Sequence, residues 1–441
     1  MDRVLDMGDD DVAALLAQVL SEFRTRHLRL RELFIDRFEE VCFLTNLSVE
    51  RQMLIGAFFL AEYAIESAAL FNPSIVADPD QRGVAPGALR FILSLRATGE
   101  GHISSITFRG GMLHADGRLE VYAAGGYLTE PRQIPNARYE KPLCARKLDE
   151  LGLTSDFAHA VLASLDNYFT LPELRRSIDA ELAHNEDRNA ALGIWMLAKS
   201  NYEVKFEASQ KLAERVLFPA TPAQRNGIED ARFVRFQNDN GEHTYFATIT
   251  AFDGRMVLPE LVETSDFLSF RFLTLNGPAA TNKGMALFPR KIHGRFAMLG
   301  RQDSESISLM YSDNVHFWDE RQTLAAPEQL WELVQLGNCG SPIETDAGWL
   351  VLTHGVGPMR KYSIGAMLLD LNDPSRVLAR LREPLLHPVE QEREGYVPNV
   401  VYSCGALLHN GQLILPYGMA DHATGFARVG LAPLLAAMEP A

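Results

Sequence analysis

Cysteines, long apolar runs and basic residues are all scarce in this sequence. Its 441 residues include four cysteines, Cys42, Cys144, Cys339 and Cys404, which are scattered and form no CxxC pair. This spacing predicts neither a disulfide framework nor a structural zinc site, so we expect a reducing, cytoplasmic setting. No set of histidines and carboxylates has ligand spacing, so no metal is implied.

Targeting and membrane-spanning segments are also lacking. The start, MDRVLDMGDD, carries acids where a secretory signal would carry basic residues and then an apolar run. No apolar stretch approaches the roughly 18 residues that would span a bilayer. With 42 basic and 57 acidic residues, the net charge is −15. Such a surface repels phosphate backbones and anionic lipids, so neither nucleic acid nor a membrane is an expected partner.

Several familiar catalytic motifs are absent. The sequence has no GxGxxG after a strand, no GxxxxGK[ST], no HExxH and no GxSxG. The sequence therefore lacks the signatures of four classes of protein: dinucleotide-binding proteins, nucleoside-triphosphatases, zinc proteases and serine hydrolases. Hydrophobic residues make up 47% of the chain, enough for a large core.

Short apolar runs flanking a turn glycine recur five times and indicate β-hairpins. The turns are Asp116-Gly117, Asn240-Gly241, His293-Gly294, Ala347-Gly348 and Asn410-Gly411. The last four glycines are 53, 54 and 63 residues apart, a spacing that suits one four-stranded blade of a propeller. The sequence therefore predicts a mainly β fold, a five-bladed β-propeller, with a two-sheet sandwich as the alternative.

Two helical blocks interrupt this pattern. Residues 10–45 and 48–68 carry apolar side chains at helical spacing, and a second block spans about 145–200, with Pro172 in a first helical turn. We therefore expect four parts. These are an N-terminal helical extension (1–70), a propeller blade region (71–140), a helical insertion (141–200) and a propeller catalytic domain (201–435).

Polar residues that a hairpin does not need are candidates for a site in the central funnel. Glu229 and Asp230 stand beside Arg232 at the entry of an expected strand. One acid would face the partner of that strand while the other points into the funnel. A salt-bridged turn is the alternative reading of these three residues.

Basic residues recur near the ends of consecutive hairpins. Lys283, Arg301 and His354 converging in one cavity of an acidic protein would suit phosphate or another compact anion. Taken singly, each is also explained as an ordinary strand-end or rim residue.

Further candidates lie at both ends of the β region. Asn72 and Arg96 frame the first expected blade, and Asp421 after the last hairpin either accepts hydrogen bonds from sugar hydroxyls or caps a turn. Glu392 and Glu394 are the general-base candidates if water is the nucleophile; a solvated acidic loop is the alternative.

Six blocks of the chain resemble, in order, those of glycoside hydrolase family 130. They are GIEDARFVRF, NKGMALFPRKIHGRFAML, GNCGSPIETDAGWLVLTHG, YSIGAMLLDLNDPSRV, EREGYVPNVVYSCGA and YGMAD, and the resemblance covers about residues 66–430. That family comprises β-mannoside phosphorylases and β-mannosidases on a five-bladed propeller. The resemblance implies an inverting enzyme that cleaves β-mannosidic linkages.

The resemblance also assigns roles to the candidates. Asp230 matches the general acid, which protonates the glycosidic oxygen through the 3-hydroxyl of the transferred mannose. The positions that hold this mannose correspond to Asn72, Arg96 and Asp421. The phosphate-binding positions of the phosphorylases correspond to Lys283, Arg301 and His354.

Four positions depart from the family pattern. Ala231 replaces the usual proline, and Lys283 stands where some phosphorylases have arginine. Gly284 replaces a side-chain amide, and Gln335 replaces a lysine found in others, so one cation is missing. The departures at Gly284 and Gln335 argue against phosphorolysis as the activity, whereas the retained Lys283, Arg301 and His354 argue for it.

The expected activity is phosphorolysis of a β-linked manno-oligosaccharide or mannoside to α-mannose 1-phosphate, with inorganic phosphate as co-substrate and no cofactor. An inverting β-mannosidase with Glu392 or Glu394 as base, and a non-catalytic sugar-binding propeller, are the alternatives. The resemblance also allows a homo-oligomer.

Overall fold

The computed structural model describes residues 1–441 except 43, 45, 135–136, 186, 253 and 255–256. The described residues divide into two compact units. The first comprises Met1–Ala64 with Gly125–Leu128, and the second comprises Ile65–Ala124 with Thr129–Ala441. Of the helices in these described parts, none is long and apolar enough to cross a membrane.

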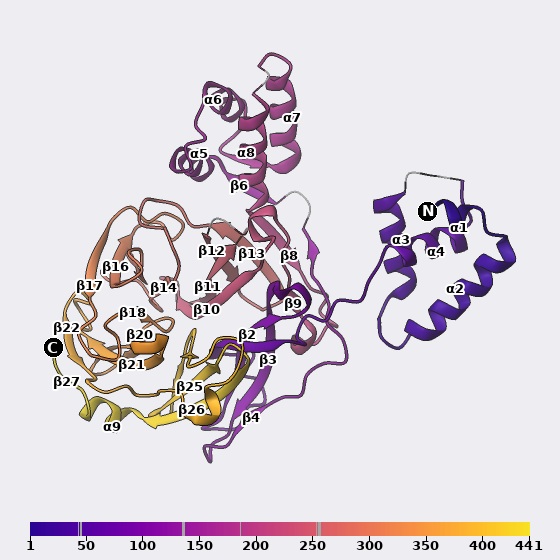
Figure 1. The fold of residues 1–441 in the computed structure, drawn as a ribbon. Helices are drawn as coiled ribbons and strands as arrows, with labels where there is room; N and C mark the ends of the chain where they lie inside the picture. The colour runs from indigo at the N-terminus through magenta and orange to yellow at the C-terminus, as the bar shows by residue number, and fades with distance from the viewer. Residues whose placement is uncertain (43, 45, 135–136, 186, 253, 255–256) are drawn as a thin grey trace. The chain divides into compact units, whose positions relative to one another are not determined.

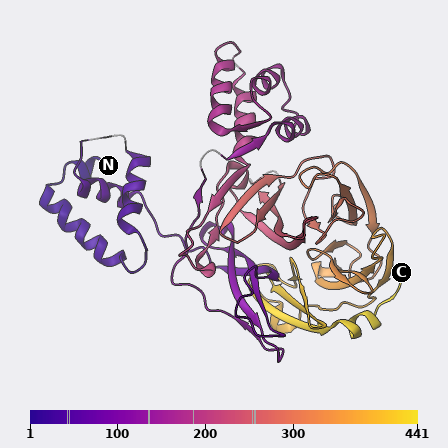
Figure 2. The same cartoon turned by 180° about the vertical axis from the view of Figure 1, so that it is seen from behind.

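The first unit is helical (Figures 1 and 2). Its helices are α1 (Asp2–Leu5), α2 (Asp9–Phe23), α3 (Leu30–Val41) and α4 (Val49–Phe58). Ser48 caps α4, because its side chain accepts a hydrogen bond from the backbone of Arg51. The range expected as one helix, 10–45, contains both α2 and α3, and residues 43 and 45 lie outside the described part. The chain turns between these helices, where Arg26 and His27 both bind Glu62.

The second unit contains six antiparallel sheets, counted over the described residues: five larger ones and a two-stranded one in the helical insertion. The first sheet consists of β1 (Ala69–Ala77), β2 (Leu89–Thr98), β3 (Ser104–Leu113), β4 (Leu119–Val121) and β9 (Val216–Leu217). The second consists of β10 (Ile228–Gln237), β11 (His243–Phe252), β12 (Val257–Thr264), β13 (Ser269–Thr274), β8 (Tyr202–Lys205) and β5 (Arg132–Gln133). The third consists of β14 (Ala286–Leu287), β15 (Phe296–Gly300), β16 (Ile307–Ser312) and β17 (Arg321–Ala325).

The remaining two larger sheets follow in chain order. The fourth consists of β18 (Gln335–Asn338), β19 (Ile343–Thr345), β20 (Gly348–Val356), β21 (Tyr362–Leu369), β22 (Val377–Arg380) and β27 (Glu439–Pro440). The fifth consists of β23 (Val401–Tyr402), β24 (Leu407–His409), β25 (Gln412–Met419) and β26 (Ala423–Gly430). A short helix, α9 (Leu431–Ala436), follows β26.

Each sheet packs on the next, and the fifth packs on the first. The contacting strands are β1 with β10, β11 with β14, β15 with β18, β21 with β23 and β25 with β1. A buried apolar cluster lies at each of these junctions, as where Phe108 of the first sheet meets Phe233 of the second. At the last junction, Thr424 Oγ1 donates to Leu70 O at 2.8 Å. The sheets therefore form a cycle of neighbours (Figure 1).

The five predicted turns are found, one in each of these sheets. Asp116-Gly117 joins β3 to β4, Asn240-Gly241 joins β10 to β11, and Asn410-Gly411 joins β24 to β25. His293-Gly294 lies between β14 and β15, and Ala347-Gly348 lies between β19 and β20. The spacing regularity starts only with the second turn, because the helical insertion, from β6 to α8 (138–199), lies between Gly117 and Gly241.

A helical insertion separates the first two sheets. It contains α5 (Lys141–Glu150), α6 (Asp156–Ala163), α7 (Leu171–Leu182) and α8 (Arg188–Lys199), with a two-stranded sheet of β6 (Arg138–Glu140) and β7 (Tyr168–Thr170). Pro172 lies in the first turn of α7, as predicted, and Thr170 and Glu173 form a capping box there. The insertion has an apolar core of its own, around Phe157, Leu174 and Ile194.

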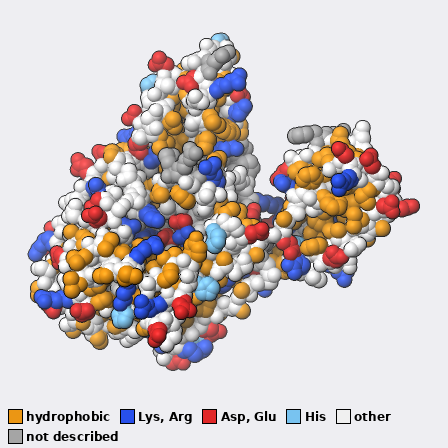
Figure 3. Space-filling view, viewed as in Figure 1, with side chains coloured by type: hydrophobic (Ala, Val, Ile, Leu, Met, Phe, Trp, Pro, Cys, Tyr) orange, Lys and Arg blue, Asp and Glu red, His pale blue; other side chains and the backbone are white. Residues whose placement is uncertain are grey.

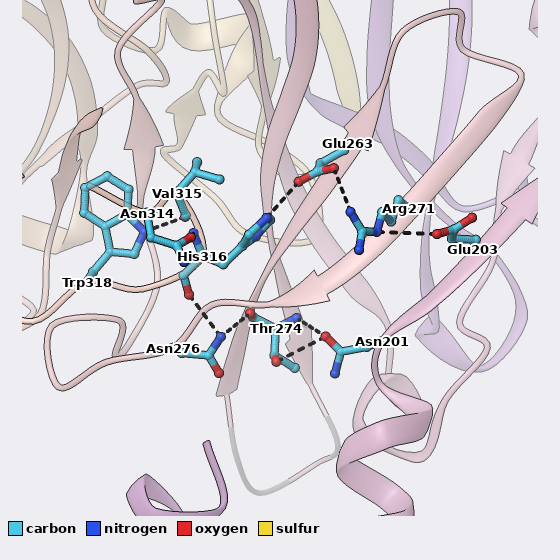
Figure 4. A network of polar contacts seen from close by, with 10 residues as sticks. All are labelled: Asn201, Glu203, Glu263, Arg271, Thr274, Asn276, Asn314, Val315, His316 and Trp318. Atoms are coloured by element: carbon cyan, nitrogen blue, oxygen red, sulfur yellow. Dashed lines mark hydrogen bonds and ion pairs between the residues drawn. The ribbon is translucent and has the colours of Figure 1, made fainter. Parts of the chain in front are cut away.

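A polar network ties the return from the insertion to the second and third sheets (Figure 4). Asn201, which directly precedes β8, accepts a hydrogen bond from the backbone of Thr274 at 3.0 Å. Arg271 lies between Glu203 and Glu263, and Glu263 also pairs with His316 at 3.2 Å. The end of the insertion is thus fixed to the outer strands of the second sheet.

Candidate active site

Side chains from four of the five larger sheets, and from the segments that flank β14 and β15 of the third, meet in one cavity of about 130 Å³. Every sugar-side and phosphate-side residue predicted from the sequence lines it: Asn72, Arg96, Asp230, Lys283, Arg301, His354 and Asp421. Arg360, Tyr362, Val397, Val400 and Tyr402 complete the lining. The predicted residues are therefore brought together, although the sequence separates Asn72 from Asp421 by most of the chain.

Two β-bulges aim the central pair of side chains at each other. The register of β1 against β2 shifts between Phe71 and Ser74, and that of β10 against β11 shifts between Glu229 and Arg232. Asn72 and Asp230, inside these shifts, have φ values of 47° and 55°. Bulges with positive φ are costly for residues other than glycine and are common beside active sites, where they redirect side chains. Here they allow Asn72 Nδ2 to donate to Asp230 Oδ1 at 2.8 Å.

Glu229 and Asp230 share Arg96 as a partner, and only Asp230 also accepts the hydrogen bond from Asn72. Arg96 Nη2 donates to Glu229 Oε1 at 2.6 Å, and its Nη1 lies 3.6 Å from Asp230 Oδ1. Burial raises the pKa of Glu229, against the opposing charge of Arg96. For Asp230, burial also acts to raise the pKa, but Arg96, Lys283 and the Asn72 hydrogen bond outweigh it and lower the pKa. Asp230 is therefore an ionised carboxylate at neutral pH.

Arg232 supplies a further cation, to which the sequence analysis assigned no role in the site. Two residues after Asp230, it is 4% exposed, and its Nη2 donates to Tyr402 Oη. Its Nη1 is buried without a hydrogen-bond partner among the described residues. A buried guanidinium donor is costly to leave unpaired, so this group is suited to an incoming anion.

Arg301 and His354 form a second polar pair beside the cavity. Arg301 Nη1 lies 3.0 Å from His354 Nε2, and Arg301 Nε is a second buried donor for which the described structure offers no partner. Burial, together with Arg301 and Arg232, lowers the pKa of His354 well below its ordinary value. The imidazole is therefore neutral and accepts a hydrogen bond from Arg301 through Nε2. His354 supports a cation and carries no positive charge of its own.

The positions that depart from the family pattern have local explanations. Gly284, with φ of 89°, follows Lys283, and a Cβ there would lie 3.5 Å from Arg232 Nη1. That distance is an ordinary van der Waals contact, so the positive φ, rather than a lack of space, favours glycine here. Gln335 lies against the same group; with its amide oxygen toward Arg301, it accepts a hydrogen bond from Arg301 Nη1.

Asp421 faces the site from the turn between β25 and β26, with φ of 52°. Burial and the nearby Asp230 carboxylate raise its pKa to about 6, although Arg96 opposes them. The cavity thus holds two carboxyls with pKa values shifted in opposite directions. Such pairs are typical of sites that handle protons.

Glu392 and Glu394, the predicted alternative bases, are not among the described residues that line the cavity. Glu392 lies in a short 3₁₀ turn, where its Oε1 accepts a hydrogen bond from Tyr417 Oη at 2.6 Å. Glu394 is exposed. The structure therefore does not bring these two glutamates to Asp230.

Four lining or supporting residues were missed as site residues: Arg232, Arg360, Tyr362 and Tyr402. Arg232 stands two positions after Asp230, but the bulge between Glu229 and Arg232 interrupts the alternation of side chains, so this spacing alone did not assign its face. The two tyrosines gave no signal, because an aromatic residue beside a strand normally packs in the core.

Comparisons with known proteins identify the class. The sequence model of a family described as beta-1,4-mannooligosaccharide phosphorylase matches residues 186–439, more than half of the chain. The sheets and their central cavity are thus those of a carbohydrate-active enzyme. The chain belongs to glycoside hydrolase family 130.

Individual relatives agree with this assignment. The chain is 34% identical over 225 residues to a 1,2-beta-oligomannan phosphorylase of Thermoanaerobacter sp., covering 49% of this chain and 73% of the relative. It is 34% identical over 230 residues to a beta-1,2-mannobiose phosphorylase of Listeria innocua, covering 51% of this chain and 63% of the relative.

Solved structures share the fold. The Listeria innocua beta-1,2-mannobiose phosphorylase in complex with beta-1,2-mannobiose aligns with a TM-score of 0.50 at 23% identity, over 85% of this chain and 92% of that one. A structure from work on family-130 glycoside hydrolases that target beta-1,2 mannosidic linkages in Candida mannan aligns with a TM-score of 0.50 at 16% identity, over 83% and 86%.

Proposed function

We propose that this protein is an inverting β-mannoside phosphorylase, which transfers a mannosyl group from a β-mannoside to inorganic phosphate and releases α-mannose 1-phosphate. The observation that carries this proposal is the pair of buried, unpartnered guanidinium donors, on Arg232 and Arg301, beside Asp230 and Lys283. Donors of this kind suit a compact anion that enters the site. The relatives named as phosphorylases use phosphate, which supports the same conclusion.

The proposed reaction uses two sides of the cavity. Asn72, Arg96 and Asp421 hold the mannose, while Lys283 and Arg301 bind phosphate, with His354 orienting Arg301. Asp230 gives a proton to the 3-hydroxyl of the mannose, which passes its own proton to the glycosidic oxygen. The bond from that oxygen to C1 breaks, and a phosphate oxygen attacks C1 from the opposite face. Binding and charge neutralisation suffice for this attack, so no enzymic base is required.

Phosphate also prepares the acid in this proposal. The charges of Arg96 and Lys283 lower the pKa of Asp230. A phosphate dianion bound beside Lys283 neutralises part of this charge, so the pKa of Asp230 rises and its protonated form becomes more populated. The co-substrate therefore promotes protonation of the residue that acts as general acid.

The cycle of five sheets supports the reading as a five-bladed propeller, with each sheet as one blade and the cavity at the centre. A homo-oligomer stays a prediction.

The experiment is incubation of the protein with β-1,2-mannobiose, with and without phosphate, followed by detection of mannose 1-phosphate. We expect this product only with phosphate. Equal cleavage without phosphate would identify a β-mannosidase, and binding without cleavage under either condition would identify a sugar-binding protein.

A further inference from the structure

An apolar cavity of about 510 Å³ lies between the helical insertion and the second sheet. Leu151, after α5, and Met196, on α8, line it from the insertion. Leu258, on β12, lines it from the sheet, and Pro278 and Ala280 line it from the segment after β13. Hydrophobic side chains are visible on the surface of the insertion in Figure 3.

This cavity adjoins the candidate active site. Pro259 lines both it and the small recess that is bounded by Asp230 and Lys283. Asn282, another lining residue, directly precedes Lys283. The pairing of β10, β11 and β12 places Glu229 opposite Thr250, and Thr250 opposite Pro259. The cavity and Asp230 therefore lie at the same end of the second sheet.

Three polar side chains that line the cavity are already engaged. Lys147 Nζ donates to Leu275 O at 2.8 Å and to Glu150 Oε2 at 3.0 Å. Glu150 Oε1 accepts a hydrogen bond from the backbone of Gly277, and Asn282 Nδ2 donates to Arg301 O at 3.2 Å. A sugar placed here would bury hydroxyls against groups that have partners elsewhere, which costs free energy.

Apolar surface, by contrast, is available. Leu151, Met196 and Val257 all line the cavity and are each 38% exposed to solvent. Covering such side chains with an apolar ligand is favourable in proportion to the area removed from water. The lining from α5 lies outside residues 186–439, which match the family, whereas the lining from α8 and β12 lies inside that range.

We propose that this cavity binds the leaving group of the substrate, and that this group is an alkyl or similarly apolar aglycone rather than a second sugar. The inference rests on the proposed function and specifies its substrate class: a β-mannoside with an apolar chain on the anomeric oxygen. The mannose lies in the central cavity, and the chain runs past Lys283 and Pro259 toward the insertion.

A series of n-alkyl β-mannosides tests this proposal. Kinetics with phosphate are measured for the ethyl, butyl and hexyl compounds, whose alcohol leaving groups are chemically almost equivalent. We expect KM to fall about two- to fourfold for each added methylene that enters the cavity. A KM that does not change with chain length would overturn the inference.

Two variants on one helix locate the effect. Met196→Glu places a charge in the cavity, and we expect the ratio of kcat/KM for hexyl to that for ethyl mannoside to fall at least tenfold. Leu192→Glu is the matched control, because Leu192 is on the same helix, is 57% exposed and does not line the cavity. If Met196→Glu does not fold, Leu151→Glu replaces it, because Leu151 also lines the cavity from the insertion. An unchanged ratio in the variants would overturn the inference.

Binding measurements separate this inference from the proposed function. If mannobiose is phosphorolysed and hexyl mannoside has no advantage, the function stands and the apolar aglycone is wrong. If no mannoside is cleaved, the proposed function is wrong. Calorimetry without phosphate then still compares the affinities for hexyl and ethyl mannoside, and so tests whether the cavity binds the alkyl group. Light scattering provides a last check, since an assembly that Met196→Glu dissociates would assign this face to a second copy of the chain.

Discussion

Asn72 donates a hydrogen bond to Asp230 at 2.8 Å, although 158 positions separate the two residues in the sequence. Both residues lie in β-bulges and both have positive φ. The same backbone conformation occurs at Arg360 and Asp421, which line the same cavity. Strained backbone of this kind persists where the surrounding sheets hold it, and it fixes side chains in place before a substrate arrives.

Replacement of Asp230 by asparagine should remove the acid and keep the shape of the site. We expect kcat for mannobiose phosphorolysis to fall by about 10²–10⁴-fold, the usual contribution of a general acid, whereas mannoside binding persists. Rates of mannose 1-phosphate formation and calorimetric titration measure the two effects.

A matched control for this change is Asp239→Asn. Asp239 is exposed in the turn after β10 and pairs with Lys291 at 2.6 Å. We expect this variant to keep wild-type kcat. Wild-type activity in Asp230→Asn would rule out Asp230 as the acid.

Loss of Lys283 should act on phosphate more than on sugar. In Lys283→Ala, we expect KM for phosphate to rise about ten- to hundredfold, since hydrogen bonds to charged groups are worth about 1.5–3 kcal/mol. Lys291→Ala is the control, because Lys291 is engaged with Asp239 and does not line the cavity. An effect of Lys283→Ala confined to the KM for mannobiose would contradict the assignment.

His354 should contribute through Arg301 and not through a charge. We expect His354→Ala to raise KM for phosphate about tenfold, and His354→Gln, which keeps an acceptor, to restore part of the loss. Because the ring is neutral, KM for phosphate in the wild type should show no step near pH 6.5 that His354→Gln removes. Such a step would mean that the protonated ring binds the anion.

On the basic side of the pH profile, phosphate should raise the pH at which activity is lost. Bound phosphate offsets the cations that lower the pKa of Asp230, so Asp230 stays protonated to higher pH. Profiles measured at saturating and at low phosphate should therefore differ, with the basic limb at higher pH under saturation. Identical basic limbs would show that phosphate does not affect the acid.

Asp421 should lower stability at neutral pH. Folding raises its pKa from 3.8 to about 6, so the folded protein binds this proton more tightly than the unfolded chain does. Stability therefore falls as pH rises through this range, by at most about 3 kcal/mol. We expect Asp421→Asn to raise the melting temperature by a few degrees at pH 7.5, less at pH 4.5, and to weaken mannose binding. An equal gain at both pH values would contradict this pKa.

The sheets and the residues of the cavity were predictable, because local signals and a family resemblance agreed. Asn-Gly predicted a hairpin at both Asn240-Gly241 and Asn410-Gly411, and the structure has hairpins there. Asn410-Gly411 is a two-residue turn with positive φ at both positions, whereas the loop at Asn240-Gly241 is longer and only Gly241 has positive φ. Asp230 and Asp421 were recognisable from the blocks in which they stand. Their roles in the reaction stay predictions.

Other features depend on tertiary structure and cannot be recognised from any short segment of the sequence. The neutral state of His354 follows from its burial beside Arg301 and Arg232, which no short segment encodes. The free donor of Arg232 likewise depends on where Tyr402 lies, 170 positions away. The apolar cavity needs two walls, α8 and β12, that are joined only when the return from the insertion is fixed to the second sheet (Figure 4).

The packing of the fifth sheet against the first has a consequence for biosynthesis. On a ribosome, Asn72 emerges hundreds of residues before Asp421, and the cavity lacks part of its lining until β25 and β26 have docked beside β1. A nascent chain that has already formed its first three sheets and most of the fourth, which β27 completes, is therefore still inactive, and activity begins only after the last sheet has been translated and has closed the cycle.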